Sequence, residues 1–191
     1  MEGADVVYEL GVGSGWNLAT LKCKLKLGWD AADFLRPAIE AGGIQFTPIN
    51  EVPDNSVDVV ICHHTLEHLL NPPESLGEMR RILKPAGKLL LHVPYEKERR
   101  YRTFNAMEPN HHLYSWNVQT LGNLLVEIGF KIEAAHIGLF GYDRFAANLA
   151  FKFHLGETGF KLIRMMAHLL RPGSEVQIRA TIGDFKVYAG K

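Results

Sequence analysis

The sequence predicts an α/β fold in which helices cover both faces of a doubly wound, mostly parallel sheet. Three observations carry this prediction. Apolar, β-branched runs recur along the chain, segments with helical spacing of apolar residues separate them, and a glycine-rich turn directly follows the first run. Parallel neighbours need a crossover between them, and right-handed crossovers place helices on both faces. Ligands of such sheets bind at the carboxyl ends of the strands.

The first half of the chain alternates strand and helix. Residues 5–10 form an apolar run that stops at the glycine turn, which is typical of a buried strand. Leu18 and Leu21 then lie at helical spacing, and the alternation of apolar and polar residues at 25–29 indicates a second strand. The expected elements are strands at 5–10, 25–29 and 44–48 and helices at 17–24 and 35–41.

The second half continues this alternation. Strands are expected at 57–62, 88–94 and 131–137, and helices from Asn71 to before Pro85 and at 117–128, the last one ended by Gly129. Residues 160–170 form an amphipathic helix, for which packing on the sheet or a role as a lid is preferred to binding a membrane surface. Residues 176–182 alternate like an edge strand.

Length and composition fit one domain. The 191 residues are 47% hydrophobic, so we expect a single domain over 1–191, with its core at 5–137 and a C-terminal helix and edge strand in 138–191. The formal net charge of zero argues against a nucleic-acid partner. Cys23 and Cys62 lie far apart in apolar stretches and indicate reduced thiols of a cytoplasmic protein. Charged residues interrupt the apolar region 137–155, so we expect no membrane span and no signal peptide.

The turn Gly11-Val12-Gly13-Ser14-Gly15 lets the backbone approach a ligand closely. It departs from the dinucleotide fingerprint G-x-G-x-x-G, because Trp16 stands where the third glycine would fall. Glu9, just before the turn, would repel a diphosphate but suits a ligand with an ammonium and a sulfonium group, which favours S-adenosylmethionine. Asp30 ends the second strand, where its carboxylate can accept both hydroxyls of a ribose. The alternative role for Asp30 is a helix N-cap.

Several motifs resemble those of class I S-adenosylmethionine-dependent methyltransferases, in the ubiquinone and menaquinone methyltransferase-like branch with type 11 or type 23 domains. These motifs are Tyr8 to Gly15, Pro53 to Val60, Leu66-Glu67-His68 and Glu78 to Gly87. The resemblance covers most of the chain. It implies a Rossmann-like, three-layer sandwich around a seven-stranded sheet whose last strand is antiparallel.

The resemblance also implies where the cofactor binds. Its methionine part would lie near Glu9 and Gly11, its ribose on Asp30 and its adenine between Ala31 and Asn50, with His63 as a further contact. The loop at residues 47–50 departs from the family because it offers no acidic residue for the adenine amino group. The sequence also starts at its first strand, whereas family members usually carry helices before it.

Methyl transfer from a sulfonium is an in-line displacement with a neutral leaving group, so holding the reactants in line supplies most of the acceleration. A base is needed only when the attacking atom carries a proton. The candidates are His63 and His64, after the fourth strand, and His111 and His112, which we expect to face the same crevice. His112 ranks first because the segment from His112 to Ser115 resembles a family segment near the pocket. A structural hydrogen bond is the alternative role for each histidine.

His64, Glu67 and His68 have the spacing of metal ligands. Some ubiquinone-pathway O-methyltransferases, which the motifs resemble, place a divalent metal on an equivalent group whose first member is glutamate. Because His64 replaces that glutamate, we expect no metal, with Glu67 orienting the loop and His68 packing on the following helix. The charge run from Glu96 to Arg102 is interpreted as a solvated loop rather than a contact for phosphate or an acidic glycan.

The predicted function is therefore S-adenosylmethionine-dependent transfer of a methyl group to an oxygen or nitrogen atom of a small molecule or glycan, with S-adenosylhomocysteine as product. A non-catalytic cofactor-binding or assembly protein of the same fold is the alternative. A nicotinamide oxidoreductase is disfavoured by Glu9 and Trp16. We expect a cytoplasmic protein with no nucleic-acid partner, and a homodimer as one option.

Overall fold

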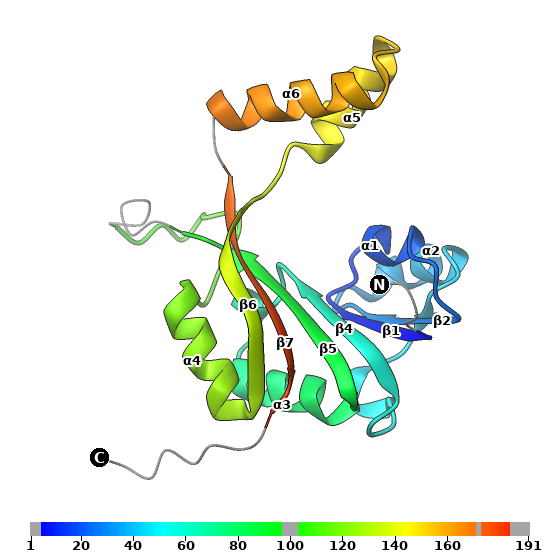
Figure 1. Ribbon diagram of the computed structural model, residues 1–191, viewed down its shortest axis with the longest axis vertical. Helices are drawn as coiled ribbons and strands as arrows, with labels where there is room; N and C mark the ends of the chain where they lie inside the picture. Colours follow the sequence, from blue (N-terminus) through cyan, green and yellow to red (C-terminus); the bar gives the residue numbers. More distant parts are fainter. Residues whose placement is uncertain (1–4, 97–102, 171–172, 184–191) are drawn as a thin grey trace.

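The structure is a computed structural model that describes residues 5–96, 103–170 and 173–183. They form one seven-stranded sheet with the order β3-β2-β1-β4-β5-β7-β6 (Figure 1). The strands are β1 (Val6–Leu10), β2 (Leu25–Trp29), β3 (Gln45–Phe46), β4 (Val57–His63), β5 (Leu83–Pro94), β6 (Phe130–Leu139) and β7 (Ser174–Ile182). β7 runs antiparallel to both of its neighbours and the other pairs are parallel, which confirms the expected fold class.

Helices pack on both faces of the sheet and make three layers. α1 (Trp16–Ala19) and α2 (Arg36–Ala41) contribute to a smaller core that contains Val7 of β1. α3 (Pro72–Ile82) and α4 (Val118–Ile128) contribute to a larger core that contains Tyr8. Val7 and Tyr8 are consecutive, and consecutive residues of a strand point to opposite faces of the sheet. Three short 3₁₀ helices complete the loops, namely η1 (Asp33–Leu35), η2 (Ile49–Glu51) and η3 (Leu66–His68).

The helix predicted from Asn71 has Asn71 as its N-cap and ends earlier than expected. The Asn71 side chain caps α3 by accepting a hydrogen bond from the backbone N–H of Glu74. The last helical residue is Ile82, because Leu83 already pairs with β4 in the sheet. The extended backbone favoured before Pro85 fits this early end. The helix predicted at 17–24 is likewise shorter, and only the single turn of α1 forms.

β7 is not the edge strand that its alternation predicted. It lies between β5 and β6, and the edges of the sheet are β3 and β6. Val176 and Ile178 of β7 point into the larger core, whereas Gln177 and Arg179 point to the opposite and less buried face. The alternation therefore reports a difference in burial between the two faces, which an interior strand of an antiparallel pair can also show.

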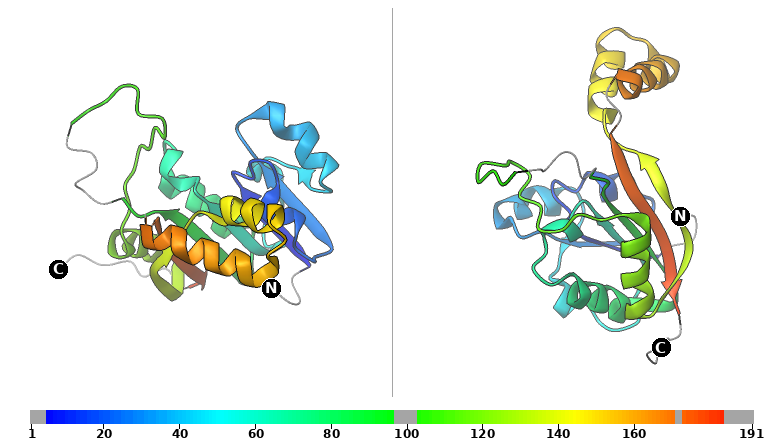
Figure 2. Two further views of the ribbon diagram at one scale, coloured as in Figure 1. Left: turned by 90° about the horizontal axis from the view of Figure 1, so that it is seen from above. Right: turned by 90° about the vertical axis from the view of Figure 1, so that its left-hand side faces the viewer.

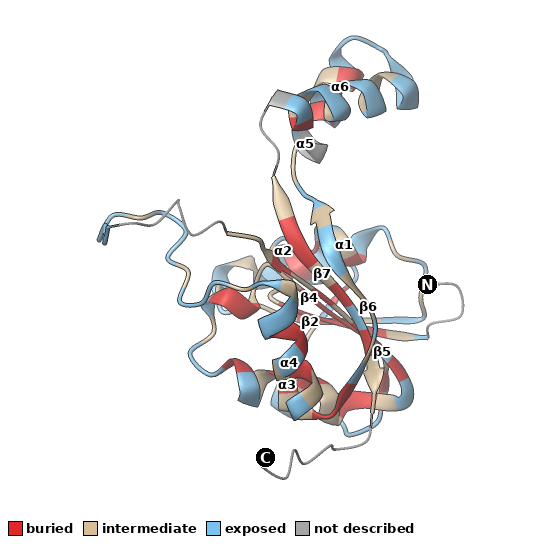
Figure 3. Ribbon diagram, turned by 60° about the vertical axis from the view of Figure 1, so that its left-hand side comes forward, coloured by how far each residue is buried: buried red, intermediate tan, exposed pale blue. Residues whose placement is uncertain are grey.

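The segment between β6 and β7 is a helical hairpin made of α5 (Asp143–Lys152) and α6 (Gly156–Leu170). Of the two roles preferred for residues 160–170, packing on the sheet is wrong, because α6 packs on α5, a helix that the sequence did not predict. The role as a lid stays a prediction. The hairpin stands beyond the carboxyl ends of the strands (Figures 1 and 2) and much of it is exposed (Figure 3). Its large exposed apolar side chains include Phe145, Phe151, Phe153, Leu162, Met165, Met166 and Leu169. No helix in the described part of the chain combines the length and apolar character needed to cross a membrane.

Candidate active site

One face of the sheet carries a row of ionisable side chains at its carboxyl end. In β1, β4 and β5, the residues that alternate with those of the larger core include Glu9, His63 and His92. His63 and His92 are Cα partners across the parallel pair β4–β5, and His92 is the partner of Gln177 in β7. This ladder brings the row next to the glycine turn that follows β1.

The glycine turn has the backbone conformation that its sequence predicted. Gly11 and Gly13 have φ angles of 74° and 52°, in the left-handed region that side chains other than glycine rarely adopt. A Cβ on Gly11 would also collide with the side chain of Thr65, whereas a Cβ on Gly13 would meet no atom within 4 Å. The turn is therefore packed from one side at Gly11 and open beside Gly13.

Glu9 lies at this turn and is almost fully buried. Its Oε1 accepts a hydrogen bond of 2.6 Å from Nδ2 of Asn17, while Oε2 has no hydrogen-bond partner in the described structure. Burial raises the pKa of Glu9 to about 7, although the hydrogen bond from Asn17 opposes this shift. A buried carboxylate oxygen without a donor is costly, so this site suits a ligand that brings a cationic group.

Asp30 lies at the end of β2 and faces the same turn. Its Oδ2 accepts a hydrogen bond of 2.8 Å from the N–H of Gly13, and its Oδ1 accepts one of 2.9 Å from the N–H of Ala32. The N-cap residue of the following η1 is Ala32, so Asp30 is not a helix N-cap. Ala31 is exposed beside it, and Asn50 is exposed on η2, which follows β3. The predicted cofactor residues thus lie at the ends of neighbouring strands.

Glu175, the second residue of β7, gathers the histidines of β4 and β5. Its Oε2 lies 2.9 Å from Nε2 of His64 and 3.5 Å from Nε2 of His63. Its Oε1 lies 2.8 Å from Nδ1 of His92 and accepts a hydrogen bond of 2.7 Å from Nε2 of Gln177. The carboxylate is buried, and both of its oxygens have partners.

The charge of this group resides on the carboxylate. Burial alone would raise the pKa of Glu175, but hydrogen bonds from His63, His64 and His92 outweigh it and hold that pKa well below its ordinary value. Burial lowers the pKa of His64 in spite of the neighbouring carboxylate. At neutral pH the group is therefore an ionised glutamate surrounded by a neutral His64 and further imidazoles.

A second group of histidine and glutamate lies around η3. Nδ1 of His112 is 2.9 Å from Oε1 of Glu96, and the ring of His112 meets the ring of His68 edge-on, with centroids 4.8 Å apart. Glu67 is 1% exposed, and neither of its carboxylate oxygens has a hydrogen-bond partner in the described structure. Burial raises the pKa of Glu67 to about 7.

The histidines predicted to face one crevice therefore form two groups. His63 and His64 belong to the Glu175 group and His112 to the Glu67 group, while His111 is exposed. The ring of His68 contacts that of His112, which the sequence did not predict. Its packing on the following helix stays a prediction. Of the predicted charge run, Glu96 is half-buried and paired, and residues 97–102 lie outside the described residues.

Four important neighbours were not predicted, namely Asn17, Thr65, His92 and Glu175. Strand alternation could have singled out Glu175 and His92 as polar residues in otherwise apolar strand patterns, but it does not show that the two side chains meet. The side-chain contacts of Asn17 and Thr65 depend on how the glycine turn folds back, for which the sequence carries no periodic signal.

Comparison with known proteins places the chain in a family. A family profile described as a methyltransferase domain matches residues 4–135. A curated relative from Mycobacterium tuberculosis, named "Probable S-adenosylmethionine-dependent methyltransferase", is 32% identical over 143 residues, which are 70% of this chain and 51% of that protein. A similarly named protein of Mycolicibacterium smegmatis is 29% identical over 69% of this chain and 53% of its own length. The chain thus spans about half the length of these relatives.

Solved structures share the fold at low sequence identity. An S-adenosylmethionine-dependent methyltransferase from Mesorhizobium loti has a TM-score of 0.63 at 18% identity, covering 94% of this chain and 91% of its own. The [4+2]-cyclase SpnF has a TM-score of 0.66 at 16% identity, covering 96% of this chain and 76% of its own. At these identities the likeness shows the fold alone.

Proposed function

The chain belongs to the methyltransferase-domain family, and on that premise we propose that it transfers a methyl group to an oxygen or nitrogen atom of a small molecule or glycan. S-adenosylmethionine is the cofactor that the family and the fold imply. The observation that carries the proposal is the buried carboxylate of Glu9 beside the glycine turn, with one oxygen that no described donor satisfies.

The residues at the turn fit this cofactor. Glu9 offers its unsatisfied oxygen to the ammonium group. Asp30 holds Gly13 in place and keeps further lone pairs for the ribose hydroxyls. The space beside Gly13 leaves the backbone accessible, and Ala31 and Asn50 would flank the adenine, with His63 as a further contact.

When bound, S-adenosylmethionine supplies a methyl group on a positively charged sulfur. The residues of the chain have to hold the acceptor in line, exclude water and, where the attacking atom carries a proton, remove it. Orientation alone can lower the barrier by up to about 7–11 kcal/mol. A base would add a further factor of roughly 10² to 10⁴ in rate.

Two imidazoles are candidates for that base, and in each a carboxylate holds one ring nitrogen. Glu96 holds Nδ1 of His112, and Glu175 holds Nε2 of His64. If the held nitrogen carries the proton, the other nitrogen of the neutral ring is free to accept one. The lowered pKa of His64 keeps that ring neutral at pH 7. His112 ranks first because its segment resembles the family segment near the pocket.

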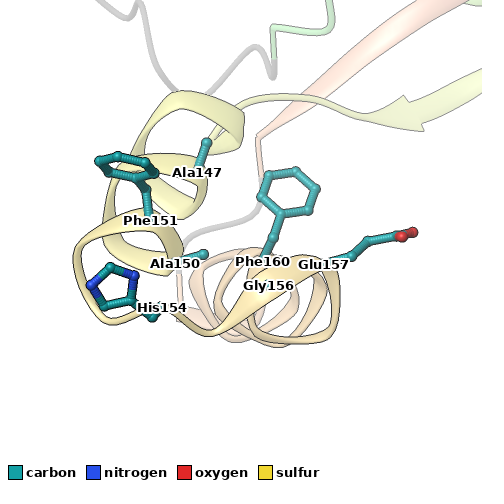
Figure 4. Close-up of a pocket in the computed structure, with 7 residues that line it drawn as sticks. All are labelled: Ala147, Ala150, Phe151, His154, Gly156, Glu157 and Phe160. Atoms are coloured by element: carbon teal, nitrogen blue, oxygen red, sulfur yellow. The ribbon is translucent and has the colours of Figure 1, made fainter.

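The helical hairpin would provide part of the acceptor site. α5 and α6 enclose an open hollow of about 470 Å³ (Figure 4). It is lined by Ala147, Ala150, Phe151, His154, Gly156, Glu157 and Phe160. The hairpin is on the carboxyl side of the sheet. The ring centroids of Phe140, which precedes α5, and His64 lie 4.1 Å apart, so the segment leading into the hairpin, and not the lining of the hollow, contacts the histidines. An apolar hollow with a few polar groups suits a small organic acceptor.

Within the family, the ubiquinone and menaquinone branch remains part of the proposal, supported by the motif Leu66-Glu67-His68. A second candidate is a non-catalytic cofactor-binding or assembly protein of the same fold. Two observations favour it. The loop at residues 47–50 has no acidic residue for the adenine, and a structural neighbour named a cyclase shows that this fold also carries other functions.

The test is to incubate the chain with methyl-labelled S-adenosylmethionine and a panel of phenols, amines and sugars. We expect a labelled product together with S-adenosylhomocysteine. Asp30→Ala should weaken cofactor binding roughly 10- to 100-fold, because two charge-assisted hydrogen bonds are lost. Asp33→Ala, at an exposed aspartate of η1, is the matched control. Cofactor binding without any methylated product would favour the second candidate, and no cofactor binding to folded protein would overturn both.

A further inference from the structure

Two consecutive histidines at the end of β4 direct the same ring nitrogen at one carboxylate oxygen. Nε2 of His63 and Nε2 of His64 lie 3.5 Å and 2.9 Å from Oε2 of Glu175. The three atoms all lie within 4.8 Å of one another. The two rings are stacked, with centroids 4.5 Å apart and planes inclined by 20°.

This convergence depends on an uncommon backbone conformation. Consecutive residues of a strand point to opposite faces, so two extended histidines could not reach the same carboxylate. His64 instead has a φ angle of 51°, in the left-handed region that a non-glycine residue rarely adopts. Its N–H donates to the carbonyl of His92 at 2.9 Å, which fixes the turn against β5. Such strain tends to occur at functional sites.

The far side of the carboxylate is held by other residues. Oε1 of Glu175 contacts His92 Nδ1 at 2.8 Å and Gln177 Nε2 at 2.7 Å. Oε2 is therefore left to the two stacked histidines, and the orientation of the carboxylate is fixed from behind. Metal-binding carboxylates are commonly held in this way by hydrogen bonds from residues that do not touch the metal.

We propose that His63 Nε2, His64 Nε2 and Glu175 Oε2 bind a divalent transition-metal ion of the zinc type. Two imidazoles and one carboxylate are a common donor set for such ions, and three protein ligands leave at least one coordination position open. In a tetrahedral zinc site, ligand atoms about 2.0–2.1 Å from the metal lie roughly 3.3 Å apart. The two Nε2–Oε2 separations, 2.9 Å and 3.5 Å, lie on either side of this value, and the two Nε2 atoms lie within 4.8 Å of each other.

The metal replaces the proton that otherwise links each imidazole to the carboxylate. In the metal-free protein, His63 and His64 can each donate an N–H to Glu175, which satisfies the ionised oxygen. Zinc binds a neutral imidazole, so on metal binding the proton on each Nε2 has to move to Nδ1 of the same ring. Acid conditions that protonate the rings compete with the metal, so affinity should fall as the pH is lowered. A metal on Nε2 of His64 leaves its Nδ1 protonated, so His112 is the candidate base when the metal is bound. The proposed site is separate from Glu67 and His68, which form another group with His112.

The test is calorimetric titration of the chelator-treated chain with zinc chloride in the absence of cofactor. We expect saturable binding of one zinc ion that depends on Glu175, with a dissociation constant below about 10 μM. Glu175→Gln and His64→Asn should each weaken it by at least about 100-fold, and His92→Asn by roughly 10- to 100-fold. Cobalt in place of zinc should give a visible absorption band that the first two variants lose.

Two controls separate this site from others. His136→Asn removes an exposed imidazole of β6 and should leave zinc binding unchanged. Glu67→Gln removes the carboxylate of the other group and should also leave it unchanged. Circular dichroism confirms that each variant is folded, and His64→Asn serves if Glu175→Gln is not. The proposal would be overturned if the parent protein bound no zinc. It would also be overturned if Glu175→Gln and His64→Asn still bound zinc while Glu67→Gln did not. None of these measurements depends on the proposed methyl transfer.

Discussion

The Glu175 region and the Glu67 region each bury one carboxylate among histidines, yet their electrostatics are opposite. The Glu175 side chain is 4% exposed and the Glu67 side chain 1% exposed. Glu175 has three imidazoles and an amide at its oxygens, and its pKa lies well below the ordinary value. Glu67 has no hydrogen-bond partner in the described structure, and its pKa rises to about 7. The charge of a buried carboxylate thus follows the donors that reach it rather than its burial alone.

The largest expected effect is on stability at pH 7.5 in chelator-treated protein. Glu175→Gln breaks an ionised, hydrogen-bonded group and should lower the free energy of unfolding by about 2–4 kcal/mol. Glu67→Gln replaces a carboxylate that has no donor and should leave the free energy of unfolding unchanged or raise it. Urea denaturation of both variants measures the difference. Equal losses would show that the two regions are electrostatically alike.

The second effect is the pH dependence of the free energy of unfolding, which should have opposite signs for Glu67 and Glu175. The pKa of Glu67 is higher in the folded protein, about 7, than its ordinary value of 4.5, so protonation of Glu67 favours the folded state. This stabilisation is fully present below pH 4.5 and is lost as the pH rises towards 7. Glu67→Gln should therefore gain about 2–3 kcal/mol over the parent protein between pH 5 and pH 8. For Glu175 the sign is reversed, because its stabilisation is present above pH 4.5 and lost as the pH falls further. A pH-independent difference for Glu67→Gln would contradict this assignment.

The smallest effect concerns Thr65, which lies between the two regions and packs against the glycine turn. Gly13→Ala should cost about 1 kcal/mol, because only the left-handed backbone opposes the new side chain. Gly11→Ala should cost about 1 kcal/mol more, because its Cβ also meets Thr65. Thermal unfolding of the two variants measures this difference, and adding Thr65→Gly to Gly11→Ala should remove it. If Gly11→Ala and Gly13→Ala destabilised the protein equally with Thr65 in place, the Thr65 side chain would have moved aside at no cost.

Local signals predicted the framework of the fold. The run at residues 25–29 forms β2 with the same bounds, and the strand expected at 57–62 extends by one residue to His63. Gly129 ends α4 as expected, with a φ angle of 92°. These elements rest on apolar periodicity and helix-end chemistry, which act over a few residues. The hairpin helix α5 was missed because its apolar residues meet another helix instead of the sheet.

The sequence predicted only those site residues that lie at the end of a strand or in the turn that follows it. Glu9, Asp30 and the glycines follow directly from a strand and its turn, and they lie together in the structure. Glu175 joins the site from a strand more than 100 positions away, through the antiparallel pairing of β7 with β5. Pairing between distant strands is a tertiary property that a single sequence does not display, so the histidines were identified without their carboxylate.

The most direct test of the account is calorimetric binding of S-adenosylmethionine to the parent protein and to Glu9→Gln at pH 6 and pH 8. The pKa of Glu9 is about 7, so about ten times more of the carboxylate is ionised at pH 8 than at pH 6. The affinity of the parent protein should therefore rise about 10-fold over this range, beyond any change that Glu9→Gln also shows. Glu9→Gln should also bind roughly 10- to 100-fold more weakly at pH 8. Equal affinity of the two proteins at both pH values would contradict the claim that Glu9 receives the cationic cofactor.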